Sequence, residues 1–86
     1  MQRAYIFINA ESGKLWRIAE AAAKVGGVKM TDAITGEYDV VVYSELEDMG
    51  QLSDLIHQLH AIDGVIQTHT SIVIPPRIPI DEALHH

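Results

Sequence analysis

The apolar residues of this chain follow two periods, one typical of strands and one typical of helices. In the first half, residues 4–9 and 28–34 read as strands. Between these segments, apolar residues recur every three or four positions, as on one face of a helix: Leu15, Ile18, Ala19, Ala22 and Val25. Gly26 and Gly27 follow this pattern and predict the end of the helix.

The second half repeats the same order. Residues 38–44 and 65–74 read as strands, and Asp48 with Gln51 three positions later resembles a capping box at the start of a helix. The apolar stripe of that helix consists of Leu52, Leu55, Ile56 and Leu59. Gly64 predicts its end.

The two halves are related by a shift of 37 positions. This shift aligns Gly27 with Gly64 and Val28 with Val65, and it aligns the two helical stripes, pairing Leu15 with Leu52, Ile18 with Leu55, Ala19 with Ile56, Ala22 with Leu59 and Val25 with Ile62. Two strand-helix-strand units joined by a short hairpin give the order β-α-β-β-α-β. The sequence therefore predicts a ferredoxin-like α+β fold, a four-stranded antiparallel sheet with both helices on one face.

The strands are apolar on both sides, so the face of the sheet without helices also needs to be covered. Tyr5 and Phe7 alternate with the aliphatic residues of the first strand, and Val41 and Tyr43 do the same in the third. A sheet with one solvated face normally alternates apolar with polar residues. We therefore expect a homodimer that packs through the helix-free face, and it could assemble further.

Length, cysteine content and charge limit the possible partners and location of the protein. A single domain of 86 residues buries only about 60–65% of its extended surface, so added burial through oligomerisation or a ligand is expected. There is no cysteine, and the net charge is −6 with scattered cations, which disfavours disulfides and direct nucleic-acid binding. The lack of a signal peptide or a long apolar stretch favours a cytoplasmic protein without a membrane segment.

Residues 1–74 are expected to form the ferredoxin-like domain and residues 75–86 a Pro-rich tail. Pro75, Pro76 and Pro79 make the tail extended. Its Ile78 and Ile80 would either clip onto a neighbouring subunit or stay loose. His85 and His86 are either native or the beginning of a purification tag.

Candidate chemistry is concentrated in the hairpin between the halves. Gly36 permits a tight turn that presents Glu37, Tyr38 and Asp39 at the end of a rigid sheet, although glycine and acidic residues are also ordinary turn residues. A carboxylate can hold an ammonium, and free turn N–H groups can hold a carboxylate, so the pair suits an amino acid. Hydroxyls from Thr68 and Thr70 would add polar contacts, supplied by a neighbouring chain.

Other chemistry finds little support. His57 and His60 are three residues apart on the second helix but at the edge of its buried stripe, so a metal site is disfavoured. His69 reads as a packing or interface residue, and Trp16 lies off the first helix stripe, where packing against another subunit is favoured. No serine lies in a nucleophile elbow, and no glycine-rich loop has phosphate-binding spacing, so neither a catalytic residue nor a cofactor is predicted.

Over residues 3–74 the chain resembles the effector-binding (RAM) domain of the Lrp/AsnC transcription regulators, in its stand-alone form without a DNA-binding domain. The resemblance rests on the element order, the Gly-Val pairs at 27–28 and 64–65, the Gly36–Asp39 turn opening an aliphatic strand, and the closing segment 68–74. It implies sheet-mediated dimers assembled into rings, commonly octamers, with an amino acid bound between dimers. It also implies a site including Gly36, Tyr38 and Asp39, with Glu37 at a variable position and Thr68 and Thr70 as less secure additions.

Three functions remain open at this point. The favoured one is a non-enzymatic amino-acid-sensing module that could modulate transcription through a full-length Lrp/AsnC-type partner. The second is a small dimeric α/β-barrel enzyme of oxygenase or isomerase type, which would need His69 or Tyr43 in an enclosed pocket. The third is a purely structural partner of a full-length regulator.

Overall fold

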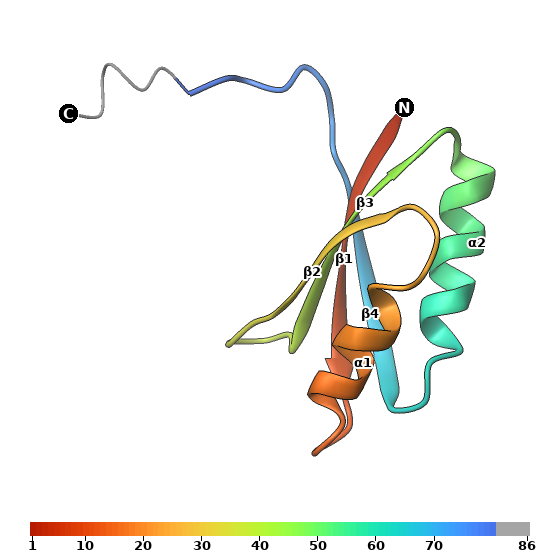
Figure 1. The fold of residues 1–86 in the computed structure, drawn as a ribbon. Coiled ribbons are helices and arrows are strands. Elements are labelled where there is room, and N and C mark those ends of the chain that lie inside the picture. Colours follow the sequence, from red (N-terminus) through yellow and green to blue (C-terminus); the bar gives the residue numbers. More distant parts are fainter. Residues whose placement is uncertain (81–86) are drawn as a thin grey trace.

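A computed structural model describes residues 1–80 and contains four strands and two helices (Figure 1). In chain order these are β1 (Gln2–Ala10), α1 (Leu15–Ala22), β2 (Val28–Ala33), β3 (Val40–Leu46), α2 (Met49–His60) and β4 (Val65–Ile72). The sheet order is β2-β3-β1-β4, every neighbouring pair is antiparallel, and both helices cover one face. The ferredoxin-like prediction is confirmed.

The pairing of β1 fixes which side chains share a face. Ile6 lies opposite Val42 of β3 and Thr70 of β4, and all three point toward the helices. The next residue, Phe7, lies opposite Val41 and faces away from the helices. Both faces of the central strands therefore carry apolar side chains, as the sequence predicted.

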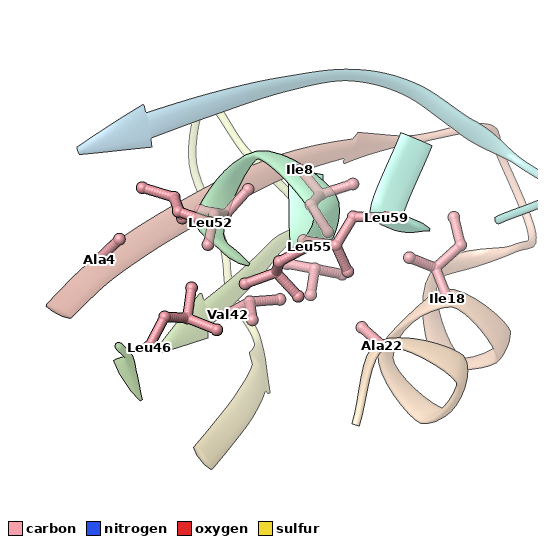
Figure 2. Packing of buried hydrophobic residues seen from close by; sticks show 11 residues of the cluster. Ala4, Ile8, Ile18, Ala22, Val42, Leu46, Leu52, Leu55 and Leu59 are labelled. Atoms are coloured by element: carbon pink, nitrogen blue, oxygen red, sulfur yellow. The ribbon is translucent and has the colours of Figure 1, made fainter. Parts of the chain in front are cut away.

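The core lies between the sheet and the two helices (Figure 2). Its fully enclosed aliphatic side chains come from both halves of the chain: Ala4, Ile6, Ile8, Ile18, Ala22, Val40, Val42, Leu52, Leu55 and Leu59. Removing one such leucine side chain typically costs about 2–5 kcal/mol. The core thus rests on the predicted helical stripes, although Leu15, Ala19, Val25 and Ile56 of these stripes are only partly buried.

Local hydrogen bonds define the start of α2 and the end of α1. The Asp48 carboxylate accepts a hydrogen bond from the N–H of Gln51 at 2.9 Å, which is the predicted cap. The returning bond of a capping box shifts by one residue, because Gln51 Oε1 accepts from the N–H of Glu47 at 3.0 Å. The first helix is shorter than its apolar pattern predicts, because α1 ends at Ala22. Val25 lies in the following turn, where its N–H donates to the Ala22 carbonyl.

Most predicted strand boundaries were wrong by one or two residues, including the start of the third strand and the end of the last. The third strand begins at Val40 rather than at Tyr38, because the backbone of Asp39 closes the turn and its side chain bonds to β1. The last strand ends at Ile72 rather than at Ile74. The N–H of Val73 still donates to the carbonyl of Arg3 at 2.8 Å, which is the last bond between this segment and the sheet.

The tail leaves the body of the molecule beside the N-terminus (Figure 1). Residues 73–80 form no helix or strand, and the side chains of Ile78 and Ile80 are exposed. Arg77 Nη2 approaches the Tyr43 hydroxyl at 3.4 Å, so this segment reaches the helix-free face. His85 and His86 lie outside the described residues.

Neither α1 nor α2 has the length and apolar character needed to cross a bilayer, and these are the helices within residues 1–80.

Candidate functional site

The turn between β2 and β3 is a closed hairpin whose tip is Gly36. The N–H of Ile34 donates to the Asp39 carbonyl at 2.9 Å, and the N–H of Asp39 donates to the Ile8 carbonyl of β1 at 2.9 Å. Gly36 has a φ of +109°, a value that costs a residue with a side chain roughly 1–2 kcal/mol. The positive φ predicted for Gly36 is confirmed, and the turn is tied to the central strand.

The Asp39 side chain has a structural partner that sequence reasoning missed. Its Oδ2 accepts a hydrogen bond from the N–H of Ala10 at 2.8 Å, where the β1–β4 register shifts between Asn9 and Ala10. An N–H freed from a ladder by such a bulge needs another acceptor, and a carboxylate is a strong one. Asp39 therefore keeps one carboxylate oxygen, Oδ1, for any other contact.

The tip of the turn carries unused backbone donors. Within residues 1–80, the N–H groups of Gly36, Glu37 and Tyr38 donate no hydrogen bond, and the Glu37 side chain is exposed. Successive free N–H groups in a turn form a concave surface that favours an anion. A carboxylate acceptor and several donors are thus neighbours in one short segment.

Tyr38 turns onto the helix-free face of the sheet. Its ring centroid lies 5.4 Å from that of Phe7 and 6.1 Å from that of His69, and both pairs are tilted. A second aromatic pair, Tyr5 and Tyr43, follows along the same face with centroids 5.0 Å apart. These separations are typical of favourable aromatic packing, so the turn is joined to an aromatic surface.

Thr68 and Thr70 lie on the opposite face of the sheet from Tyr38. They pair with Ile8 and Ile6, whose side chains enter the core under the helices. Thr68 Oγ1 lies 2.8 Å from His60 Nε2 of α2. The structure of one protomer therefore brings Gly36–Asp39 together but does not bring Thr68 and Thr70 to the same side, and strand alternation around His69 was the sequence signal for this.

The charged groups with displaced pKa values lie elsewhere. Lys14 Nζ is 3.0 Å from Asp63 Oδ2 and 3.3 Å from Glu11 Oε2. The hydrogen bond from Lys14 lowers the pKa of the Asp63 carboxyl, and the same contact raises the pKa of Lys14. This exposed cluster links the start of α1 to the loop after α2 and does not involve the turn.

Metal ligation finds no geometric support in residues 1–80, which contain no group of three histidine, cysteine or acidic side chains placed for one ion. His57 and His60 are both exposed, as predicted. Two surface grooves, of about 290 and 450 Å³, include none of the turn residues. The turn therefore lies outside both of these grooves.

Residues 3–80 match the family model of the Lrp/AsnC ligand binding domain, and the chain belongs to this family. It is 31% identical over 71 residues to the HTH-type transcriptional regulator FL11 of Pyrococcus furiosus, covering 83% of this chain and 47% of the relative. The chain thus spans about half the length of that regulator.

Two solved structures give the comparison in three dimensions. TTHA0845 from Thermus thermophilus has a TM-score of 0.87 and 26% identity, with 92% of this chain and 100% of that chain covered. The transcriptional regulator NMB0573 of Neisseria meningitidis, solved as an L-Met complex, has a TM-score of 0.76 and 26% identity, with coverage of 86% and 50%. These two structures show the fold, and one of the two is a complex with L-Met.

Proposed function

We propose that this protein is a non-enzymatic, oligomeric module that senses a small amino acid at the Gly36–Asp39 turn. The observation that carries the proposal is the group of three unpaired N–H donors directly before a carboxylate that retains one free oxygen. An α-amino acid presents the complementary pair, a carboxylate beside an ammonium. The L-Met complex of the Neisseria regulator supports this class of ligand.

Each turn residue receives a role from its position. The N–H groups of Gly36, Glu37 and Tyr38 hold the ligand carboxylate, and Oδ1 of Asp39 accepts from its ammonium while Oδ2 keeps its bond to Ala10. The Tyr38 ring forms one wall, and the exposed Glu37 carboxylate lies at the rim. Thr68 and Thr70 complete the pocket from a neighbouring subunit, since they occupy the other face of their own sheet.

The helix-free face is the proposed dimer interface. Tyr5, Phe7, Tyr38 and Tyr43 lie on it, and Tyr5 is 39% exposed in the single protomer. A second sheet would cover these rings, and rings of dimers up to an octamer would then place one turn against another subunit. Tyr5→Glu is expected to convert the dimer to monomer in sedimentation at micromolar concentration, and an unchanged dimer would refute this interface.

The cellular role follows from the relatives. Because the longer FL11 is named as a transcriptional regulator, co-assembly with a full-length relative in the cytoplasm would let a bound amino acid alter that partner's DNA affinity. Pull-down of such a regulator only with added amino acid supports sensing. Equal pull-down without it favours the purely structural partner.

The enzyme alternative lacks its required geometry. His69 and Tyr43 lie on the helix-free face, and neither lines the grooves of about 290 and 450 Å³. Relatives matched over 83% and 81% of this chain are named as transcriptional regulators, whereas a homocitrate synthase matches 58% of it. No feature of residues 1–80 favours catalysis over binding.

A thermal-shift screen of the twenty amino acids tests the sensing function. A ligand that binds only the folded protein stabilises it by about 2.7 kcal/mol at one hundred times its Kd, so a small subset should raise the Tm by roughly 10–20 °C. Asp39→Asn should lose the response, because it removes the charge but keeps an acceptor for Ala10. Asp54→Asn, an exposed carboxylate on α2, should keep it. No response to any amino acid would overturn the proposal.

A further inference from the structure

The two edge strands of the sheet, β2 and β4, differ in how well they are protected against pairing with another chain. β2 has six residues, carries Lys29 and Asp32, and shifts its register against β3. Short length, charged side chains and bulges are the usual means by which edge strands avoid further pairing. β4 has eight residues with no acidic residue, lysine, arginine or proline, and its register shift against β1 lies at its beginning. Residues 67–72 therefore form an unprotected edge.

Alternate residues of β4 direct their backbone groups away from β1. The N–H of Val73 donates to the Arg3 carbonyl at 2.8 Å, one step beyond the pairing of Ile72 with Ala4. In an antiparallel ladder, residues that bond to one neighbouring strand alternate with residues whose N–H and C=O point to the other side. Within residues 1–80 no strand lies on that other side of β4. The outward set consists of Thr68, Thr70 and Ile72.

The flank of α2 beside this edge is uncharged as well. His60 lies on it, because its Nε2 is 2.8 Å from Thr68 Oγ1. Residues three or four positions apart share a helix face, so the same flank includes Met49, Ser53 and Ile56. The opposite flank carries Asp54 and lines the groove beside Gly27. In a chain with a net charge of −6, the edge and the flank next to it carry no formal charge.

The edge of β4 is complementary to a second copy of itself. When two such strands pair antiparallel about a two-fold axis at Thr70, each Thr70 faces its counterpart, and Thr68 faces Ile72 of the partner subunit. These residues belong to the outward set, so each facing pair can exchange two backbone hydrogen bonds. On the other face of the sheet, His69 meets Ser71 of the partner subunit. Threonine pairs across strands are favourable, and no like charges meet in this register.

We propose that the β4 edge pairs with the β4 edge of a second copy, antiparallel and in this register, so that one sheet continues across two subunits. The surface differs from the helix-free face, and the pairing would join two of the dimers proposed above. A strand edge buries less apolar surface than a sheet face, so the pairing forms at higher protein concentration than the dimer. It requires neither the sensing function nor the face dimer.

Introduced cysteines test the register, because the chain has no cysteine of its own. In Thr70→Cys the facing Cβ atoms lie about 4.5–5.5 Å apart, close to disulfide geometry. Thr68→Cys is the matched control on the same strand and face, and its counterpart lies roughly 13 Å away along the partner strand. Under mild oxidation at millimolar subunit concentration, Thr70→Cys should form a covalent dimer at least about ten-fold faster than Thr68→Cys. Equal rates would overturn the proposal.

Charge exchange tests the pairing without a covalent bond. Thr70→Lys and Thr70→Glu each place like charges opposite one another, so sedimentation should show no association of dimers for either variant alone. An equal mixture of the two should restore it. Association of Thr70→Lys to the same extent as the parent chain would rule out this edge.

The Tyr5→Glu variant separates this inference from the proposed dimer face. Cross-linking of Thr70→Cys should persist when Tyr5→Glu is added, because the edge lies apart from the helix-free face. Loss of cross-linking in that background, with the fold intact by circular dichroism, would show that the edge does not pair on its own and would overturn the proposal. A Tyr5→Glu chain that stays dimeric at micromolar concentration refutes the face, and preferential cross-linking at Thr70→Cys in it still supports the edge.

Discussion

The carboxylate of Asp39 is expected to stabilise the fold before it binds anything. In Asp39→Ala the N–H of Ala10 loses an acceptor at 2.8 Å in a half-buried position. A hydrogen bond to a charged group contributes about 1.5–3 kcal/mol net, and partial exposure reduces this to about 1–2 kcal/mol here. For a domain of this size that loss corresponds to a fall in Tm of roughly 5–15 °C.

Asp39→Asn separates this role from ligand binding. The amide oxygen can still accept from Ala10, so the loss should be at most about half that of the alanine variant. Urea unfolding followed by circular dichroism, without amino acid and at one fixed protein concentration, gives both free energies of unfolding. If the alanine variant is as stable as the parent, or if both variants lose the same amount, the structural role assigned to Asp39 is wrong.

Two further predictions concern the fold. Because Lys14 lowers the pKa of Asp63, the stabilisation from this carboxylate is present above its ordinary value of 3.8 and is lost as the pH falls through the lowered value. Asp63→Asn should therefore lower the urea midpoint at pH 7 but not at pH 2, and an equal gap at both would contradict this. Gly27 has a φ of +92°, and an added Cβ would collide with the Leu46 side chain, so Gly27→Ala should cost about 2–4 kcal/mol. Gly36→Ala, with open space around the Cβ, should cost only about 1–2 kcal/mol in the same unfolding assay, and equal losses would rule out the steric term.

The fold could be predicted because local and repeated signals agree. The stripes of both helices, the cap at Asp48 and the glycines after each helix all specify boundaries from short segments, and the shift of 37 positions identifies equivalent units. The reciprocal bonds between the halves confirm this equivalence: the Gly64 carbonyl accepts from the N–H of Glu11, and the Gly27 carbonyl accepts from that of Glu45. Such consistency between local pattern and overall fold is typical of natural sequences.

The candidate site was less predictable because it depends on contacts distant in sequence. The hydrogen bond between Asp39 and Ala10 spans 29 positions and requires a β-bulge that no residue pattern predicts. Likewise, the pairing of Tyr38 with Phe7 requires the register of two strands. That Thr68 and Thr70 share a face opposite to that of His69 could have been inferred, since strand neighbours alternate.

The antiparallel pairing of β1 with β4 places both ends of the domain at one corner, with Ala4 opposite Ile72, while the Gly36 turn lies at the other end of β1. At about 3.3 Å per residue, the nine residues of β1 separate the two by roughly 25–30 Å. A module fused to either end of the domain would therefore sit far from an amino acid at the turn. Communication between them would have to pass along a stiff central strand or through neighbouring subunits, and assembly would then transmit the signal more readily than bending within one protomer.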